Sequence, residues 1–168
     1  MPELIVADAG PLIGLARTGF LFLLKDLYGK VLIPPQVYAE LQINSGRPGS
    51  ETLRMALEEG WMHQAALDFT DELKDLAMIL DPGEAEAILL AEQRAAQFLL
   101  IDEKRGRTVA RGRGLHVVGV GGVLLAAKES RLIDQVAPAI ERLIASEYRL
   151  SAKLWATILE LAGEAEDH

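Results

Sequence analysis

The sequence predicts a three-layer α/β/α domain, in which helices cover both faces of a central parallel sheet of about four or five strands. Short, wholly apolar segments alternate along the chain with longer segments of helical periodicity. The apolar segments are closely followed by turn or acidic residues, which is typical of strands buried on both faces of a sheet. Leu and Ala supply 51 of the 168 residues, which favours abundant helix. This length suits one domain, so we expect residues 1–168 to fold together.

The first half of the chain follows this alternation closely. The predicted elements are a strand at 4–7, a helix from Pro11, a helix at 20–28, a strand at 30–33, a helix after Pro34 and Pro35, a loop at 44–50, a helix at 51–59 and a weak strand at 61–65. Pro11 suits the first turn of a helix because its missing N–H is not needed there. Gly29 suits the residue that ends a helix.

The second half continues the pattern and then becomes helical. The predicted elements are a helix at 71–80, a helix from Asp81 to about Ala96, a strand at 98–101, a basic helix, a strand at 115–118, and helices from Gly119 onward with breaks near Ser130, Pro138 and Leu150. We expect the helices at about 132–162 to pack on the domain. Their apolar residues serve either to cover the sheet or to form a homodimer face, and they are Leu143, Ile144, Leu154, Trp155, Ile158 and Leu161.

The composition excludes several classes of protein. The chain has no cysteine, which excludes disulfide scaffolds, thiolate zinc sites and cysteine nucleophiles. Its formal net charge of −8 argues against non-specific adhesion to nucleic acid or to an anionic membrane. The N-terminus lacks the basic segment of a signal peptide, and Arg17, Gly19 and Lys25 interrupt the most apolar stretch. We therefore expect a cytoplasmic protein with no membrane partner.

Four acidic residues occupy positions that a parallel sheet brings together. Asp8 and Asp102 each follow an apolar segment directly, at the end of a predicted strand. Glu40 lies about two turns into the helix after the second strand, and Glu84 lies in the first turn of the helix that leads to Asp102. Because ligands bind beyond the carboxyl ends of parallel strands, we expect all four carboxylates at one edge of the sheet.

Each acid, taken alone, has a structural explanation as well. Asp8 and Asp102 suit the caps of the helices that follow them. Glu84, three residues after Asp81, suits the start of a helix, and Glu40 suits a solvent-facing position. The functional hypothesis therefore rests on the four residues occurring together.

The chemistry that fits clustered carboxylates is the binding of a hard cation. Like charges repel unless a positive group neutralises them. None of the three histidines has the spacing of a zinc ligand, whereas oxygen ligands suit Mg²⁺ or Mn²⁺. Such ions activate water and stabilise the leaving oxygen in phosphodiester hydrolysis. We expect the four carboxylates to lie within one coordination shell, and at least one of them to have a raised pKa without an ion.

A basic segment begins two residues after Asp102. It contains Lys104, Arg105, Arg107, Arg111 and Arg113. Guanidinium groups bind phosphate oxygens in pairs, so Arg105 and Arg107 are candidate substrate-binding residues; the alternative is a solvated helix face. No aromatic residues interleave with these charges, so base stacking is not predicted.

A glycine-rich segment at 119–122 follows the last predicted strand. It has the look of a dinucleotide-binding loop, but the full spacing and the closing acid of that motif are missing. We therefore expect these glycines to allow close packing between strand and helix.

Several motifs resemble those of one known family. They are Asp8-Ala9-Gly10-Pro11-Leu12-Ile13, Ile33-Pro34-Pro35-Gln36-Val37-Tyr38-Ala39-Glu40, Gly83-Glu84-Ala85-Glu86-Ala87-Ile88 and Leu100-Ile101-Asp102-Glu103. Together they resemble the acidic motifs of PIN domains over about residues 4–145. The nearest resemblance is to a prokaryotic PIN-like subfamily of uncharacterised function.

The resemblance implies a metal-dependent endoribonuclease, often the toxin of a toxin–antitoxin pair. It implies that Asp8, Glu40, Glu84 and Asp102 hold one or two Mg²⁺ or Mn²⁺ ions, and that the partners are an RNA substrate and a cognate antitoxin. Two positions depart from the family pattern. Lys104 replaces a second acid, and Ala9 and Gly10 replace a hydroxyl residue. Lys104 and the acidic net charge favour the alternative, a non-catalytic PIN-like module that binds RNA or a protein.

Overall fold

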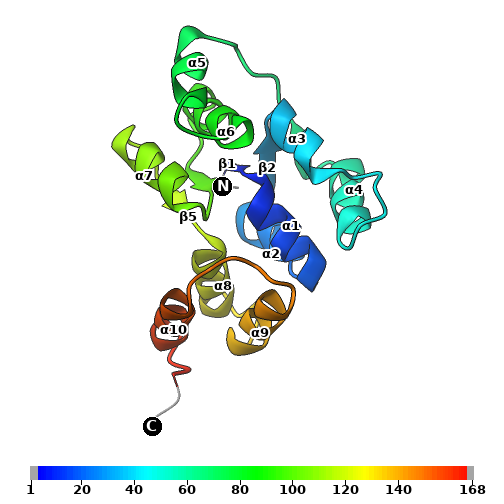
Figure 1. The fold of residues 1–168 in the computed structure, drawn as a ribbon. Coiled ribbons are helices and arrows are strands. Elements are labelled where there is room, and N and C mark those ends of the chain that lie inside the picture. Colours follow the sequence, from blue (N-terminus) through cyan, green and yellow to red (C-terminus); the bar gives the residue numbers. More distant parts are fainter. Residues whose placement is uncertain (1–3, 166–168) are drawn as a thin grey trace.

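The computed structural model describes residues 4–165 and contains a five-stranded, wholly parallel sheet between two layers of helices (Figure 1). The strands are β1 (Leu4–Ala7), β2 (Lys30–Ile33), β3 (Met62–Gln64), β4 (Phe98–Leu100) and β5 (Val117–Val118). The helices are α1 (Ala9–Thr18), α2 (Phe22–Tyr28), α3 (Pro35–Leu41), α4 (Ser50–Glu59), α5 (Asp71–Ala77), α6 (Pro82–Gln93), α7 (Lys104–Gly112), α8 (Val120–Glu129), α9 (Ala137–Ala145) and α10 (Ala152–Leu161). The predicted α/β/α fold class is confirmed.

The order of the strands places β1 at the centre of the sheet. The order is β3-β2-β1-β4-β5, so Val6 of β1 pairs with Leu32 on one side and with Leu99 on the other. The chain moves outward from β1 to β3 and then returns to β4 on the opposite side of β1. This reversal is the topological switch point at which parallel sheets bind ligands. It lies just beyond the carboxyl ends of β1 and β4.

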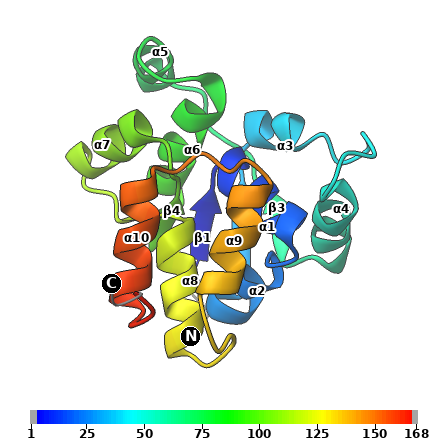
Figure 2. The same ribbon diagram turned by 60° about the horizontal axis from the view of Figure 1, so that its bottom comes forward.

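The two faces of the sheet bury separate cores. Helices α1, α2, α8, α9 and α10 cover one face, and α5, α6 and α7 cover the other (Figures 1 and 2). Ile5 and Ala7 of β1 belong to the first core and Val6 belongs to the second. All three are fully buried, as expected for a central strand in a parallel sheet. Each buried Ile, Leu or Val contributes about 1.5–3 kcal/mol to folding.

The C-terminal helices pack on the first face of the sheet. Leu143, Trp155 and Ile158 are buried there, whereas Ile144, Leu154 and Leu161 are exposed. The proposed homodimer face therefore retains only half of the predicted apolar residues. A Cβ atom on Gly121 of α8 would lie 2.4 Å from Ile158 Cδ1, so α10 can approach α8 only because this residue is glycine. The packing between strand and helix that the sequence predicts for this segment applies instead to Gly122, where a Cβ atom would lie 2.8 Å from Val118 Cγ2 of β5.

Several boundaries differ from the predicted ones. The strand expected at 115–118 pairs only at residues 117–118, and the helix expected to reach about Ala96 ends at Gln93. Beyond that helix, Ala95 turns the backbone to a φ of 49°. The predicted breaks near Ser130 and Pro138 form one connection, because Pro138 lies in the first turn of α9. No helix within residues 4–165 is long and apolar enough to cross a membrane.

Candidate functional site

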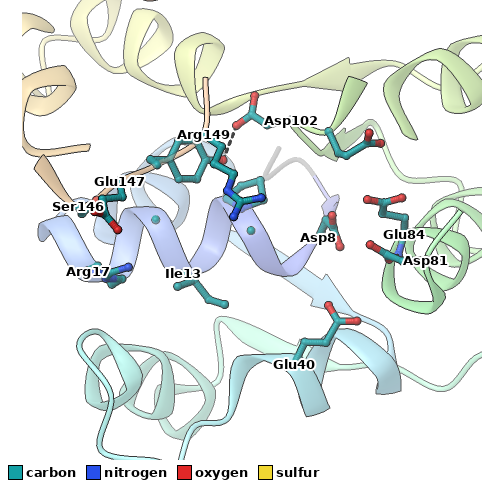
Figure 3. Close-up of a pocket in the computed structure, with 15 residues that line it drawn as sticks. Asp8, Ile13, Arg17, Glu40, Asp81, Glu84, Asp102, Ser146, Glu147 and Arg149 are labelled. Carbon is teal, nitrogen blue, oxygen red and sulfur yellow. Dashed lines mark hydrogen bonds between the residues drawn. The ribbon is translucent and has the colours of Figure 1, made fainter. Parts of the chain in front are cut away.

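A cleft of about 400 Å³ lies at the switch point, beside α1 (Figure 3). All four predicted acids line it, and so do two further ones, Asp81 and Glu103. Figure 3 shows α1 running along the cleft, with Asp8 at one end of the helix and Arg17 at the other. The four predicted acids, which are separated by 32, 44 and 18 positions in the sequence, therefore lie at one edge of the sheet.

Asp8 occupies the N-cap position of α1 without capping it. Its backbone is extended, with a φ of −81° and a ψ of 161°, and its side chain makes no capping hydrogen bond. The Asp8 N–H donates to the carbonyl of Leu100 at 2.9 Å, which ties this residue to β4. Its side chain is 8% exposed. Burial, together with the charges of Asp81 and two other acids, raises its pKa to about 7, although the backbone N–H of Ala9 lowers it in part.

Asp81 and Glu84 have different roles at the start of α6. Asp81 caps the helix, since its Oδ1 accepts a hydrogen bond from the Glu84 N–H at 2.9 Å. The Glu84 side chain is 6% exposed and faces the cleft beside Asp8 (Figure 3). Burial and the charges of Asp81, Glu103 and Asp8 raise the pKa of Glu84 to about 8. The side chain that caps α6 is therefore that of Asp81, and the side chain of Glu84 is left as a candidate metal ligand.

Glu40 lies over the first turn of α6 because residue 83 is glycine. A Cβ atom on Gly83 would lie 2.6 and 2.8 Å from the two carboxylate oxygens of Glu40. Glu40 is half-buried, and burial and the charge of Asp81 raise its pKa. The side chain lines the cleft and keeps part of its surface exposed to solvent.

Asp102 lies apart from this group and is held by two donors (Figure 3). Its Oδ2 accepts a hydrogen bond from the Tyr148 hydroxyl at 2.6 Å and another from the Val120 N–H at 3.0 Å. Asp102 thus binds the first turn of α8 and the connection between α9 and α10. Burial and the charge of Asp102 raise the pKa of Tyr148, so its hydroxyl is a firm donor.

Arg105 and Arg107 are placed differently from their predicted role. Arg105 Nη1 donates to the carbonyl of Ile79 at 3.3 Å, and Arg107 Nη1 donates to the carbonyl of Ile101 at 2.8 Å. Burial lowers the pKa of Arg107. Neither residue lines the cleft. These hydrogen bonds connect α7 to neighbouring loops. The spacing of basic residues in the sequence does not show that their guanidinium groups bind backbone carbonyls.

The cations that line the cleft are Arg17 of α1 and Arg149 of the α9–α10 connection. Within residues 4–165, neither guanidinium makes a hydrogen bond or an ion pair. Figure 3 shows Arg149 above α1, between Asp102 and Asp8. Sequence reasoning missed both arginines. The position of Arg17 could have been predicted, because it lies on the helix that follows Asp8 directly. No local feature of the sequence indicates that Arg149 reaches the cleft.

Comparison with known families decides the classification. A family model described as DUF3368: PIN domain matches residues 4–164. The chain belongs to the PIN domain family. The match confirms the resemblance seen in the acidic motifs and extends it past Tyr148 to the end of α10. PIN domains are a family of nuclease type and generally use divalent metal ions.

One solved structure is similar to part of this chain. It is a PilT N-terminus domain protein, SSO1118, from the hyperthermophilic archaeon Sulfolobus solfataricus P2. It is 18% identical to this PIN domain, with a TM-score of 0.49, and the match covers 74% of this chain and 92% of that one. A comparison with curated proteins finds no match.

The acids of this PIN domain suit a divalent cation in their chemistry. All the donors are carboxylate oxygens, and no lysine or arginine in the described chain pairs with Asp8, Glu40 or Glu84. Burial and the charge of neighbouring acids raise the pKa of each of these three acids. The expected single coordination shell is wrong, however. Within residues 4–165, no three acids or histidines are arranged to hold an ion, and Asp102 turns toward Tyr148.

Proposed function

We propose that this PIN domain is an endoribonuclease that depends on Mg²⁺ or Mn²⁺. The observation that carries the proposal is the pairing of two buried, unneutralised carboxylates, Asp8 and Glu84, with two unpaired arginines in the same cleft. Carboxylates bind the metal ions and guanidinium groups bind the phosphates of the RNA, so a metal-dependent nuclease needs both kinds of group in one cleft. Family membership supports a nuclease, and the acid-rich centre supports a metal-dependent one.

The groups that would hold the metal are the carboxylates of Asp8 and Glu84, with Glu40 beside them, whereas Asp102 adds a further carboxylate at the side of the cleft that Tyr148 forms. When bound, the ion supplies activated water and stabilises the charge that develops on the leaving oxygen. Lys104 stands where the family pattern has another acid, but the neighbouring Glu103 lines the cleft and raises the pKa of Asp8 and Glu84. The Glu103 side chain also caps α7, since its Oε2 accepts a hydrogen bond from the Gly106 N–H at 2.6 Å, so it adds negative charge beside the centre from a fixed position.

The other residues of the cleft bind and orient. Arg17 and Arg149 replace Arg105 and Arg107 as the proposed phosphate contacts, since their guanidinium groups are free and line the cleft. The Tyr148 hydroxyl and the Val120 N–H fix the orientation of Asp102.

The test is cleavage of a 5′-labelled single-stranded RNA with Mn²⁺, with Mg²⁺ and with EDTA. We expect metal-dependent cleavage by the wild-type protein. Asp8→Asn and Glu84→Gln should reduce it by more than about a hundredfold, because even residues that only support metal ligands cost about 10–100-fold. Asp75→Asn, which changes an exposed acid of α5 outside the cleft, is the matched control. A single-stranded DNA of the same sequence tests the preference for RNA.

A thermal-shift titration gives a second readout that does not depend on activity. Mn²⁺ should raise the Tm of the wild-type protein, and Asp8→Asn should reduce that shift. Equal cleavage by the wild type and Asp8→Asn would point to a contaminating nuclease. RNA binding without cleavage or a metal shift would favour the alternative, a non-catalytic RNA-binding module.

The same proposal includes a partner. If the protein is the toxin of a toxin–antitoxin pair, as the family resemblance implies, a gene for a small antitoxin lies next to its own. Co-expression of that neighbour should relieve growth arrest caused by the wild-type protein, and Asp8→Asn should cause no arrest. A gene without such a neighbour would contradict this part of the proposal.

A further inference from the structure

A second groove, of about 260 Å³, opens from the end of the cleft. Ile13, Arg17 and Glu40 line both hollows, so the two share a wall formed by α1 and α3. The outer part of the second groove is lined by Arg47 and Pro48, from the loop between α3 and α4. The acids, Arg17 and Arg47 therefore follow one another along a continuous path over the surface.

The loop that carries Arg47 is held against α1. The Arg47 N–H donates to Ser45 Oγ at 3.2 Å, and the Arg47 carbonyl accepts from the Ser50 N–H at 3.0 Å. Gly49 has a φ of 89°, and a Cβ atom there would lie 2.9 Å from the backbone nitrogen of Arg17. Only glycine allows this approach. The backbone of Arg47 is therefore positioned by the fold, next to the end of α1 that carries Arg17.

The charges along this path are available to a ligand. In the described part of the chain, the Arg47 guanidinium, like that of Arg17, has no hydrogen bond or ion pair. By contrast, Arg54, Arg113 and Arg142 are bound by acids or carbonyls of their own chain. Among residues 4–165, Glu40 is the one acid that lines the second groove, at the end shared with the cleft. The outer end is therefore cationic on an acidic protein.

We propose that Arg17 and Arg47 form a second phosphodiester subsite, which holds the single-stranded RNA chain as it leaves the acidic centre; this rests on the proposed endoribonuclease function. Guanidinium forks bind phosphate oxygens, and phosphate contacts position a chain without reading its sequence. No aromatic residue of the described chain lines this groove, so we expect no stacking of bases there. The subsite therefore favours longer chains over a dinucleotide and is indifferent to their sequence at this end.

The test measures binding of labelled single-stranded RNA of two and of eight nucleotides, by fluorescence anisotropy over a series of salt concentrations. EDTA is present, so that no cleavage occurs. The variants are Arg47→Ala and, as the matched control, Arg111→Ala, which removes another exposed and unpaired arginine from α7 outside both hollows. Cleavage of both RNAs is measured separately with Mn²⁺.

Arg47→Ala should weaken binding of the eight-nucleotide RNA on the order of tenfold. The slope of the logarithm of the binding constant against the logarithm of the salt concentration should become shallower by about one, as expected for the loss of one phosphate contact. Binding and cleavage of the dinucleotide should not change, and Arg111→Ala should match the wild type. Equal binding of the longer RNA by Arg47→Ala and the wild type would overturn the subsite, as would an equal loss in Arg111→Ala. Competition by polyglutamate as strong as that by RNA would show a groove for acidic protein instead.

The failure of the subsite can be distinguished from the failure of the proposed function. If the wild type cleaves neither RNA but Arg47 still supports binding of the longer one, the subsite stands and the nuclease proposal falls. If the wild type cleaves and Arg47→Ala changes no binding, the nuclease proposal stands and the subsite falls.

Discussion

At the scale of single residues, the most informative feature is a carboxylate that is buried without a positive partner. Asp8 follows the central strand directly, so the fold carries it out of water whether or not a cation is present. The cost of that burial appears as a raised pKa. Such a cost is typical of functional sites, because a side chain selected only for stability would be neutral or paired.

The raised pKa of Asp8 predicts how stability depends on pH. Between the unfolded value of 3.8 and the folded value of about 7, the folded protein retains a proton that the unfolded chain has released. Stability from this group therefore falls as pH rises through that window and stays low above it. Asp8→Asn removes the charge, so at pH 8 it should raise the free energy of unfolding by up to about 4 kcal/mol.

Urea unfolding in EDTA at pH 8 and pH 4 measures this effect. The difference between Asp8→Asn and the wild type should be large at pH 8 and should nearly vanish at pH 4. Asp75→Asn should show no such pattern, since Asp75 is exposed. A wild type that is as stable as Asp8→Asn at pH 8 would contradict the prediction.

At the scale of elements, the site depends on contacts between segments that are distant in sequence. The first turn of α6 accepts the side chain of Glu40 from α3 because Gly83 has no Cβ. Gly14 of α1 makes room for Tyr148 in the same way, since a Cβ atom there would lie 2.6 Å from two carbons of the Tyr148 ring. Two glycines thus allow two side chains to reach the cleft from other elements.

Gly83→Ala should disturb the site without unfolding the protein. The methyl group would displace the flexible end of Glu40, while alanine suits a helix better than glycine by about 1 kcal/mol. We expect a weaker Mn²⁺-induced rise in Tm and slower RNA cleavage, at a nearly unchanged Tm in EDTA. Gly112→Ala in α7, where a Cβ meets nothing within 4 Å, is the control. A variant with wild-type metal response would show that Glu40 has no part in the site.

Tyr148→Phe should separate positioning from packing. The ring would keep its contact with Trp155, with centroids 6.5 Å apart, but the hydrogen bond to Asp102 would be lost. Because Asp102 is an anion, the loss should cost about 1.5–3 kcal/mol of stability. As Tyr148 orients Asp102, kcat should fall more than KM rises. Tyr38→Phe, which removes a hydroxyl outside the cleft, should leave the kinetics unchanged. An unchanged kcat in Tyr148→Phe would refute the positioning role.

At the scale of the whole molecule, the C-terminal segment closes the fold through one carboxylate. Glu164, after α10, accepts hydrogen bonds from the N–H groups of Val136 and Ala137 at the start of α9. It also pairs with Lys128 of α8 at 2.9 Å. Burial acts to raise the pKa of Glu164, but these donors outweigh it and lower the pKa. One side chain therefore joins the last three helices.

Glu164→Gln should lower the free energy of unfolding by about 1.5–3 kcal/mol at pH 7, because the lost bonds involve a charged group. The stabilisation comes from the ionised carboxylate of Glu164. It should be fully present above the unfolded pKa of 4.5 and fade as pH falls through the lower folded value. Urea unfolding at pH 7 and pH 3 checks this, with Glu160→Gln on the exposed side of α10 as the control. An equal loss at both pH values would contradict it.

The sequence alone determined the strands, the class of fold and the positions of four acids. Strands buried on both faces must be apolar runs, so β1 and β4 were readable, and with them Asp8 and Asp102 at their ends. The start of α6 was equally readable from Asp81 and Pro82, because capping is a local event.

Only the tertiary structure decided which charges meet in the cleft. Arg105 and Arg107 follow Asp102 closely in sequence, yet their guanidinium groups bond to backbone carbonyls outside the cleft. Arg149 lies 47 positions after Asp102, yet it reaches the cleft because α9 and α10 pack across the sheet. A local pattern reports the direction of a side chain relative to its own helix or strand. Which distant groups it meets depends on how those elements pack, and that is a property of the whole fold.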